Sequence, residues 1–272
     1  MCINPKKRPL VSVIMGVYNS QGTLSEAVMS ILNQTYSNFE FLICDDGSTD
    51  DSLKLLGNFS DKRIKILRNE VNRGLAFSLN KCLVASSGAY VARMDADDVA
   101  FPDRLETQLS FLEKNKNIDV VGSSVTVWDG NAIIGMRNYP EFHAIEHIVS
   151  SNPFAHPTIM MKKTVYDILG GYRVDASTKR AEDLDLWFRL FRGGFKGYNI
   201  QTPLLRYTER NSDFQKRSLS AAIGIAKVYL NGYKMLGISK IYKVYALKPI
   251  ISALMPTFIK LYLRNKKLKS KG

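Results

Sequence analysis

Three features are scarce in this chain of 272 residues, and each absence excludes a class of protein. Cysteine occurs only at Cys2, Cys44 and Cys82, an odd number without metal-site spacing. We therefore expect no disulfide framework, and a reducing compartment such as the cytoplasm fits best. The first residues carry charge but no apolar segment, so we expect no signal peptide. The longest uncharged, mostly apolar run, 249–259, contains two prolines and is too short to span a bilayer.

Acidic residues are absent from the C-terminal part of the chain. Residues 214–272 contain 13 Lys and Arg but no Asp or Glu, whereas residues 1–213 contain 25 residues of each sign. The formal net charge of +13 therefore lies entirely in the tail. A nucleic-acid footprint would extend this surplus over the rest of the molecule, so we expect no nucleic-acid partner. The 45% of apolar residues suffices for a substantial core in one large domain or two small ones.

The first part of the chain alternates strand-like and helix-like segments, which predicts an α/β fold with a mostly parallel sheet. The predicted strands are residues 10–17, 39–44, 64–67 and 90–94. After residue 119 the pattern becomes mixed. The segments expected there are a strand at 120–128, a turn at 129–131, a hairpin partner from Ile133, a helix near 141–149 and a strand at 158–161.

Polar loops follow all four predicted parallel strands. They are Val17-Tyr18-Asn19, Asp45-Asp46-Gly47-Ser48, Asn72-Arg73-Gly74 and Asp95-Ala96-Asp97-Asp98. Because the carboxyl ends of parallel strands meet at one sheet edge, we expect these loops to form a ligand site. Each also has a structural explanation: Gly47 as a turn residue, Asp50 as a helix cap, or Arg73 as a surface charge.

The acidic loop after the fourth strand has two interpretations. Asp95, Asp97 and Asp98 repel one another, and a divalent metal, basic side chains or bound protons must offset their charge. Alternatively, Asp97 or Asp98 caps the helix that Pro102 announces. From these residues alone, both interpretations stay open.

A second acidic site begins the helix predicted from the spacing of Leu184, Trp187 and Phe188. Glu182 and Asp183 stand at its N-terminus, where the helix dipole favours carboxylates without any chemical role. A carboxylate near a metal site is also what a metal-assisted displacement requires.

These motifs together resemble the inverting family 2 glycosyltransferases of the GT-A fold. The resemblance covers about residues 10–210 and rests on VSVIMGVYN, CDDGSTD, NRG, MDADD followed by FPDRLE, and AEDLDLWFRL. It implies a Rossmann-like, mostly parallel sheet with a mixed second half. The implied catalytic domain is 1–213, with a nucleotide-binding half at about 10–100 and an acceptor half at about 101–213. Gly16 departs from the Pro or Thr that the family often has there.

The resemblance assigns a UDP-sugar donor to the strand-end loops. Asp46 would recognise uracil and Tyr18 would stack near the base. Val17 and Asn19 would supply loop contacts, and Arg73 would reach the nucleotide.

The acidic motifs receive catalytic roles by the same resemblance. Asp95 would face the donor, and Asp97 would ligate Mn²⁺ or Mg²⁺, hard cations that suit oxygen ligands. Asp183 would be the base that takes a proton from an acceptor hydroxyl, and inversion of an α-linked donor would give a β-glycoside. Glu182 and Asp185 are the next candidates for the base.

The predicted acceptor contacts are Glu182 and His156, which follows a loop that approaches the acceptor in the family. A hydrogen-bonded structural histidine is the alternative for His156.

The basic tail, 214–272, is expected to be an amphipathic helical segment, with a helix over 221–235 and interleaved apolar and basic residues after it. Such a mixture suits an anionic membrane surface, where each basic residue contributes about 1 kcal/mol. A solvated tail is the alternative. For a sugar transferase, the expected acceptor is a lipid-linked or surface glycan at the inner face of a bacterial cell membrane.

Two rival functions follow from the same sequence. A nucleotidyltransferase would need a glycine-rich, basic phosphate loop near the first strand, and Val17-Tyr18-Asn19-Ser20 is not one. A catalytically silent membrane-surface binding protein would be expected to have lost an acidic motif, and all are present.

Overall fold

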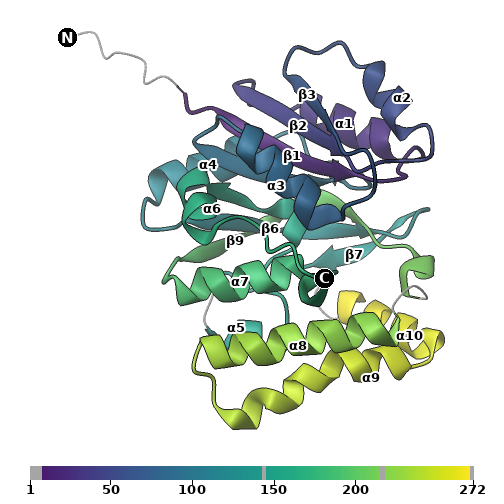
Figure 1. The fold of residues 1–272 in the computed structure, drawn as a ribbon, viewed down its shortest axis with the longest axis vertical. Coiled ribbons are helices and arrows are strands. Elements are labelled where there is room, and N and C mark those ends of the chain that lie inside the picture. The colour runs from purple at the N-terminus through teal and green to yellow at the C-terminus, as the bar shows by residue number, and fades with distance from the viewer. Residues whose placement is uncertain (1–7, 143–144, 215–217, 270–272) are drawn as a thin grey trace.

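The computed structural model describes residues 8–142, 145–214 and 218–269. One nine-stranded sheet runs through it in the order β3-β2-β1-β4-β8-β6-β9-β5, with β7 paired to β6 (Figure 1). The strands are β1 Val11–Val17, β2 Phe39–Asp45, β3 Ile64–Arg68, β4 Tyr90–Asp95, β5 Val99–Ala100, β6 Val120–Trp128, β7 Ile133–Arg137, β8 Met160–Lys162 and β9 Gly197–Thr208.

Helices cover both faces of this sheet. They are α1 Leu24–Leu32, α2 Ser52–Gly57, α3 Leu75–Ala85, α4 Arg104–Lys114, α5 Ile145–Ser150, α6 Lys163–Leu169, α7 Glu182–Arg192, α8 Leu219–Met235, α9 Lys248–Leu254 and α10 Thr257–Lys269. Four short 3-10 segments accompany them: η1 His156–Thr158, η2 Ala176–Thr178, η3 Asn211–Phe214 and η4 Lys240–Leu247.

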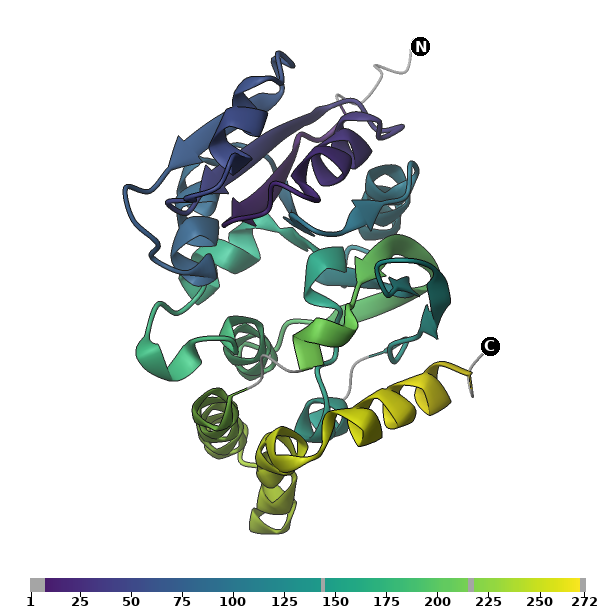
Figure 2. The ribbon, with the colours of Figure 1, turned by 90° about the vertical axis from the view of Figure 1, so that its right-hand side faces the viewer.

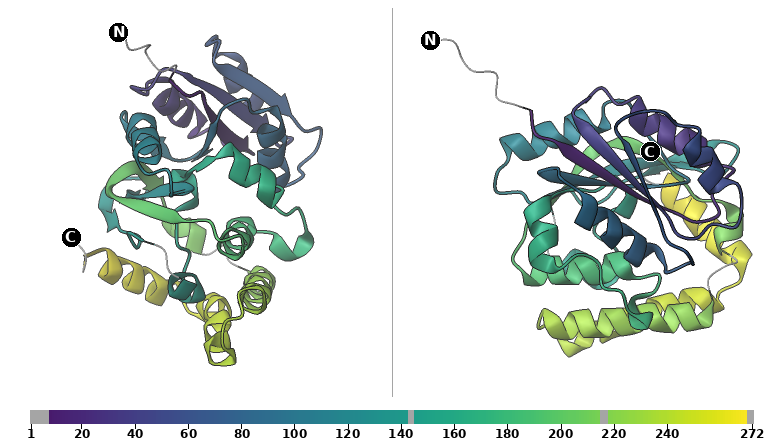
Figure 3. Two further views of the ribbon diagram at one scale, coloured as in Figure 1. Left: turned by 90° about the vertical axis from the view of Figure 1, so that its left-hand side faces the viewer. Right: turned by 45° about the horizontal axis from the view of Figure 1, so that its top comes forward.

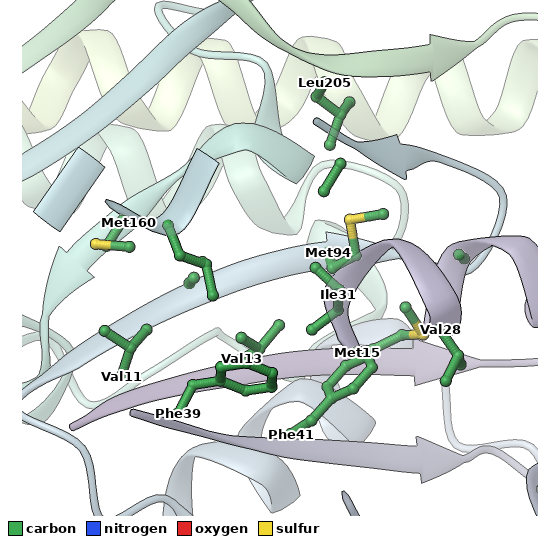
Figure 4. Packing of buried hydrophobic residues seen from close by; sticks show 14 of the residues in the cluster. Val11, Val13, Met15, Val28, Ile31, Phe39, Phe41, Met94, Met160 and Leu205 are labelled. Carbon is green, nitrogen blue, oxygen red and sulfur yellow. The ribbon is translucent and has the colours of Figure 1, made fainter. Parts of the chain in front are cut away.

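The core forms on both sides of the sheet because buried strands present alternate side chains to opposite faces. Val11, Val13 and Met15 of β1 belong to one buried cluster with residues of α1 and α4, whereas Ile14 belongs to a second cluster with residues of α3. Figure 3 shows helices on both faces of the sheet. Figure 4 shows the first of these layers, where Phe39 and Phe41 of β2 lie beside β1.

The predicted α/β order of the first half is confirmed. The pairings β1 with β2, β2 with β3, and β1 with β4 are all parallel, and each strand lies within one residue of its predicted bounds. The second half is mixed as expected, since β8 runs antiparallel to both β4 and β6, and β7 forms the predicted hairpin with β6.

The strand predicted at 158–161 was wrong in its first half. His156–Thr158 form η1, and β8 begins only at Met160. Pro157 lacks an N–H for a sheet ladder, and Thr158 donates its backbone N–H and its hydroxyl to the Ala155 carbonyl at 2.9 and 2.7 Å. The helix predicted near 141–149 is described from Ile145, and residues 143–144 lie outside the described part.

The predicted helical tail begins with α8, one side of which packs against α7. The ring of Phe188 on α7 lies 6.0 Å from the rings of both Tyr229 and Tyr233 on α8. A Cβ at Gly232 would stand 2.3 Å from the Phe188 ring, so α8 approaches α7 as closely as glycine permits. Figure 1 shows α8 between α7 and the more distal α9. The helix predicted over 221–235 is therefore confirmed and packed against the rest of the fold.

Beyond α8, the chain forms η4, α9 and α10 at the lower edge of the molecule (Figure 2). Within the described residues, no single helix is long and apolar enough to cross a membrane. Two consecutive segments, Lys240–Leu254 and Thr257–Lys266, meet that criterion only together and are bent by 120°. The far end of α10 is fixed to the sheet, because Leu268 is buried beside Gly135 of β7.

Candidate functional site

The loops after β1 and β2 are joined at the carboxyl edge of the sheet. Asn19 adopts a positive φ of 50°, a conformation that Asn tolerates better than most residues. Its side-chain oxygen accepts a hydrogen bond from the backbone N–H of Thr49 at 2.9 Å. Its own N–H donates to the Ser48 hydroxyl at 3.1 Å. The predicted contact residue Asn19 thus shapes the two loops.

Asp46 is buried and fastens the loop after β3. Its Oδ1 accepts hydrogen bonds from Asn69 Nδ2 at 2.7 Å and from the backbone N–H of Arg73 at 2.9 Å. Its Oδ2 accepts the backbone N–H of Gly74 at 2.8 Å. A carboxylate oxygen has two acceptor positions, so this single described bond leaves Oδ2 capacity for a further donor. Gly47 has a φ of +68° and no room for a side chain against the same loop.

The other residues predicted to bind the nucleotide differ in the solvent exposure of their side chains. Val17 is buried, and it contributes its carbonyl, which accepts the Asp46 N–H at 2.8 Å. The Tyr18 ring is 47% exposed at the same edge. The exposed Arg73 guanidinium lies 4.5 Å from the ring centre of Phe77, which orients it beside the loop after β3. Tyr18 and Arg73 are therefore the side chains available to a ligand here.

The three acids after β4 come together. Ligand oxygens of Asp95, Asp97 and Asp98 lie within 4.8 Å of one another. Asp95 pairs with Arg93, a buried arginine in the middle of β4. Asp97 is exposed to solvent on one side, yet partial desolvation and then the Asp95 charge raise its pKa to about 6. Asp97 is therefore mostly ionised at neutral pH, beside an Asp95 that is paired with Arg93.

Asp98 is a buried member of this cluster that the predicted site residues omit. Its Oδ1 accepts the backbone N–H of Thr208 at 2.8 Å. Its Oδ2 has no hydrogen-bond partner among the described residues, and burial followed by the charges of Asp95 and Asp97 raises its pKa well above the usual value. An oxygen-rich cluster with an unpartnered buried carboxylate oxygen fits a hard divalent cation.

The helix-cap interpretation of Asp97 and Asp98 was wrong. β5 intervenes, α4 starts at Arg104, and Asp103 occupies its N-cap position. Asp98 instead turns inward to β9, where the Thr208 hydroxyl also donates to the Asp97 carbonyl. The acidic loop is therefore fixed by a strand more than 100 residues later in the chain.

The second acidic site lies at the start of α7. Asp183 is half-buried, and its Oδ2 accepts a hydrogen bond from Asn152 Nδ2 at 2.9 Å. Burial raises the pKa of Asp183 above its ordinary value, and the backbone N–H of Leu184 and the Arg93 charge oppose this shift. Burial and the Asp183 charge raise the pKa of Glu182 to about 7. Asp185 is instead ion-paired with Arg189 at 2.7 Å and Arg173 at 3.2 Å.

His156 lies in the core behind α7. Its Nε2 is 2.8 Å from the Tyr172 hydroxyl, which in turn lies 3.2 Å from the hydroxyl of Tyr166. Burial and then the Arg93 charge lower the pKa of His156 well below its usual value. This neutral, hydrogen-bonded ring matches the structural alternative for His156.

A pocket of about 410 Å³ joins the loop after β3 to the segment before α7. Arg73 and Glu182 line it, together with Arg173, Lys179 and Arg180. The last three residues were not among the predicted site residues. Lys179 and Arg180 form a basic pair immediately before the AEDLDLWFRL motif, a signal that the prediction did not use, and the fold brings this pair into the same pocket as Arg73.

Sequence comparisons agree with this geometry. The model of the family described as Glycosyl transferase family 2 matches residues 12–169. The chain is 42% identical to EpsE of Bacillus subtilis (strain 168), over 92% of this chain and 91% of EpsE. It is 35% identical to WfgD of Escherichia coli, a UDP-Glc:alpha-D-GlcNAc-diphosphoundecaprenol beta-1,3-glucosyltransferase, over 57% of this chain and 61% of WfgD.

Solved structures share the fold. Residues 1–349 of Staphylococcus aureus TarS in complex with UDP-GlcNAc superpose with a TM-score of 0.63 at 18% identity, covering 95% of this chain and 88% of that chain. The mannosyltransferase PcManGT of Pyrobaculum calidifontis, in complex with GDP-Man and Mn²⁺, gives a TM-score of 0.64 at 19% identity, covering 97% and 81%. The expected GT-A fold is thereby confirmed.

Proposed function

The chain belongs to glycosyl transferase family 2, and on this premise we propose that it transfers a sugar from a UDP-sugar to a hydroxyl of a lipid-linked or surface-glycan acceptor, with inversion. One observation carries the proposal: a single pocket is lined by Arg73 and Gly74, whose backbone N–H groups bind Asp46, and by Glu182, which stands beside Asp183 at the start of α7. The acidic cluster follows β4 at the same carboxyl edge of the parallel sheet as Asp46.

The donor end of the site is suited to uridine. The remaining acceptor position on Asp46 Oδ2 would receive a hydrogen bond from the N3–H of uracil. The carboxylate is buried and already held by the Gly74 N–H, so its orientation is fixed before the base binds. Tyr18 would stack on the base, and Arg73 would offset phosphate charge. The UDP-GlcNAc complex of TarS and the UDP-Glc donor of WfgD support this choice of nucleotide.

Asp97, with Asp95 and Asp98 beside it, would hold Mn²⁺ or Mg²⁺. When bound, such a cation offsets the charge that grows on the diphosphate leaving group. The unpartnered Oδ2 of Asp98 and the raised pKa of Asp97 are the features that support this assignment. The Mn²⁺ in the PcManGT complex is in accord with it.

Asp183 would act as the base. Its Oδ2 accepts the proton of the acceptor hydroxyl while that oxygen forms a bond to the anomeric carbon and the bond to UDP breaks. A pKa above the ordinary value makes Asp183 a stronger base, and Asn152 orients its carboxylate. Inversion of an α-linked donor sugar then yields a β-glycoside.

We further propose that the tail binds an anionic membrane surface, which places the enzyme on the inner face of a bacterial cell membrane. Ile241, Leu254 and Phe258 are each at least 70% exposed, and tail lysines lie among them. Exposed apolar side chains beside basic residues are typical of peripheral membrane helices. The diphosphoundecaprenol acceptor of WfgD supports a lipid-linked substrate.

A thermal-shift panel of nucleotide sugars with Mn²⁺ tests the donor assignment. UDP-sugars should raise the melting temperature in a Mn²⁺-dependent manner, and the stabilising sugar should then be transferred in a product assay. Stabilisation by GDP- or dTDP-sugars instead would overturn the role given to Asp46.

A further inference from the structure

Arg180 stands where three pockets meet. The first is the pocket of about 410 Å³ that it shares with Arg73 and Glu182. The second, of about 290 Å³, contains Asp183 and Lys248. The third, of about 270 Å³, lies between α8 and α9. The second and third also share Ile225, Pro249 and Ser252, so they are adjacent.

The pocket around Asp183 contains charges of both signs. Asp183 and Asn152 lie on one side, and Arg180 and Lys248 bring two cations to the same cavity. Lys248 Nζ donates a hydrogen bond to the Ser150 carbonyl at 2.9 Å, which holds the ammonium group near this cavity. The carboxylate can accept the proton of a hydroxyl, and the two cations can bind an anionic group. The pocket therefore suits a substrate that carries a hydroxyl and an anionic group.

The third pocket is mostly apolar, and small side chains form most of its wall. Its lining residues are Arg180, Ser218, Ala221, Ala222, Ile225, Pro249, Ser252 and Ala253. The same helix, α9, then presents Ile251 and Leu254, which are 58% and 70% exposed. Apolar side chains therefore lie on α9 both in the third pocket, beside Arg180, and on the exposed surface of the tail.

We propose that these two pockets bind a polyprenyl diphosphate-linked sugar. The sugar hydroxyl lies at Asp183, the diphosphate between Arg180 and Lys248, and the first prenyl units between α8 and α9. This inference rests on the proposed function and names its acceptor class. It makes the tail a part of the acceptor site, in addition to any role in membrane attachment.

The test compares two water-soluble acceptors that carry the same sugar, one on a short-chain prenyl diphosphate and one on an alkyl group without phosphate. Their binding to the full-length protein is measured by calorimetry, without turnover. Lys248→Gln should weaken binding of the diphosphate compound roughly 10-fold or more, as expected for loss of a charge-assisted contact. It should leave binding of the phosphate-free compound unchanged.

Lys243→Gln is the matched control, because Lys243 is an exposed tail lysine that lines none of these three pockets. It should bind both compounds like the wild type. A second variant, Ala221→Phe, narrows the third pocket, so lengthening the prenyl chain should improve binding in the wild type but not in this variant.

Equal binding of the two compounds by the wild type would overturn the proposal, as would equal losses in Lys248→Gln and Lys243→Gln. A Lys248→Gln defect confined to anionic phospholipid vesicles would assign this lysine to lipid headgroups and also overturn it. Intact diphosphate binding without any transfer from UDP-sugars would instead refute the proposed function and leave the binding site standing.

Discussion

Asp97→Asn should make the metal-free protein more stable. The pKa of Asp97 is raised from 3.8 to about 6, so the folded state holds its charged form at a cost. A shift of this size corresponds to about 3 kcal/mol at most. Because the side chain is exposed, solvent screening reduces our estimate to about 1–2 kcal/mol, or roughly 2–4 °C in Tm for a chain of this length.

The pH dependence gives the sign of this effect. A carboxyl group whose pKa is raised in the folded state does not destabilise the fold below its unfolded pKa of 3.8. The folded protein loses stability as the pH rises from there to about 6, and the loss is complete above pH 6. The difference in Tm between the variant and the wild type should therefore be near zero at pH 4 and reach its plateau above pH 6.

Thermal unfolding in EDTA at several pH values measures this difference. Addition of Mn²⁺ should raise the Tm of the wild type at pH 7.5 and leave that of Asp97→Asn nearly unchanged, and the variant should lose transfer activity. A metal-free variant that melts at or below the wild-type temperature at pH 7.5 would refute the idea that Asp97 is held in an electrostatically unfavourable, ligand-ready state.

Three further predictions concern the other parts of the site. Asp183→Asn should retain UDP-sugar affinity by calorimetry but lose at least about 100-fold in kcat. In the wild type, kcat should fall with decreasing pH at a value above the pKa of an ordinary aspartate, because burial raises the pKa of this base. Full activity of the variant would assign the base to another residue. Asp46→Ala should weaken UDP binding and loosen the loop after β3, seen as faster hydrogen exchange at Arg73 and Gly74; unchanged exchange would contradict the fastening role. The double variant Leu254→Glu and Phe258→Glu should reduce sedimentation with anionic vesicles without altering UDP affinity, and equal sedimentation would refute the membrane role of the tail.

The first half of the fold was predictable because its signals are local. Each strand is a short apolar run, and polar residues mark the position where it ends, so the convergence of Asp46 and Asp97 follows from parallel topology alone. Arg93 was also a readable signal, since a charged residue within an apolar strand needs a partner, and Asp95 supplies it.

The missed parts depend on contacts between distant segments. Thr208 reaches Asp98 only because β9 closes the sheet beside β5, and no local pattern announces that pairing. Arg180 and Lys248 likewise line one pocket only because α8 and α9 pack beside the start of α7, which sequence spacing does not encode. The tail was predicted as an amphipathic segment, but only the tertiary structure reveals that tail residues line the pocket around Asp183.

The close packing of Phe188 against Gly232 has a consequence for geometry. Because α7 carries Asp183 and cannot move relative to α8 without breaking that contact, the two helices act as one rigid body. If the tail lies on a membrane and Asp183 is the base, both as proposed, this rigid connection fixes the height of the Asp183 carboxylate above the lipid headgroups. Only a hydroxyl at that height reacts, so the distance from lipid to sugar becomes a criterion for selecting the acceptor, independent of the sugar's own stereochemistry.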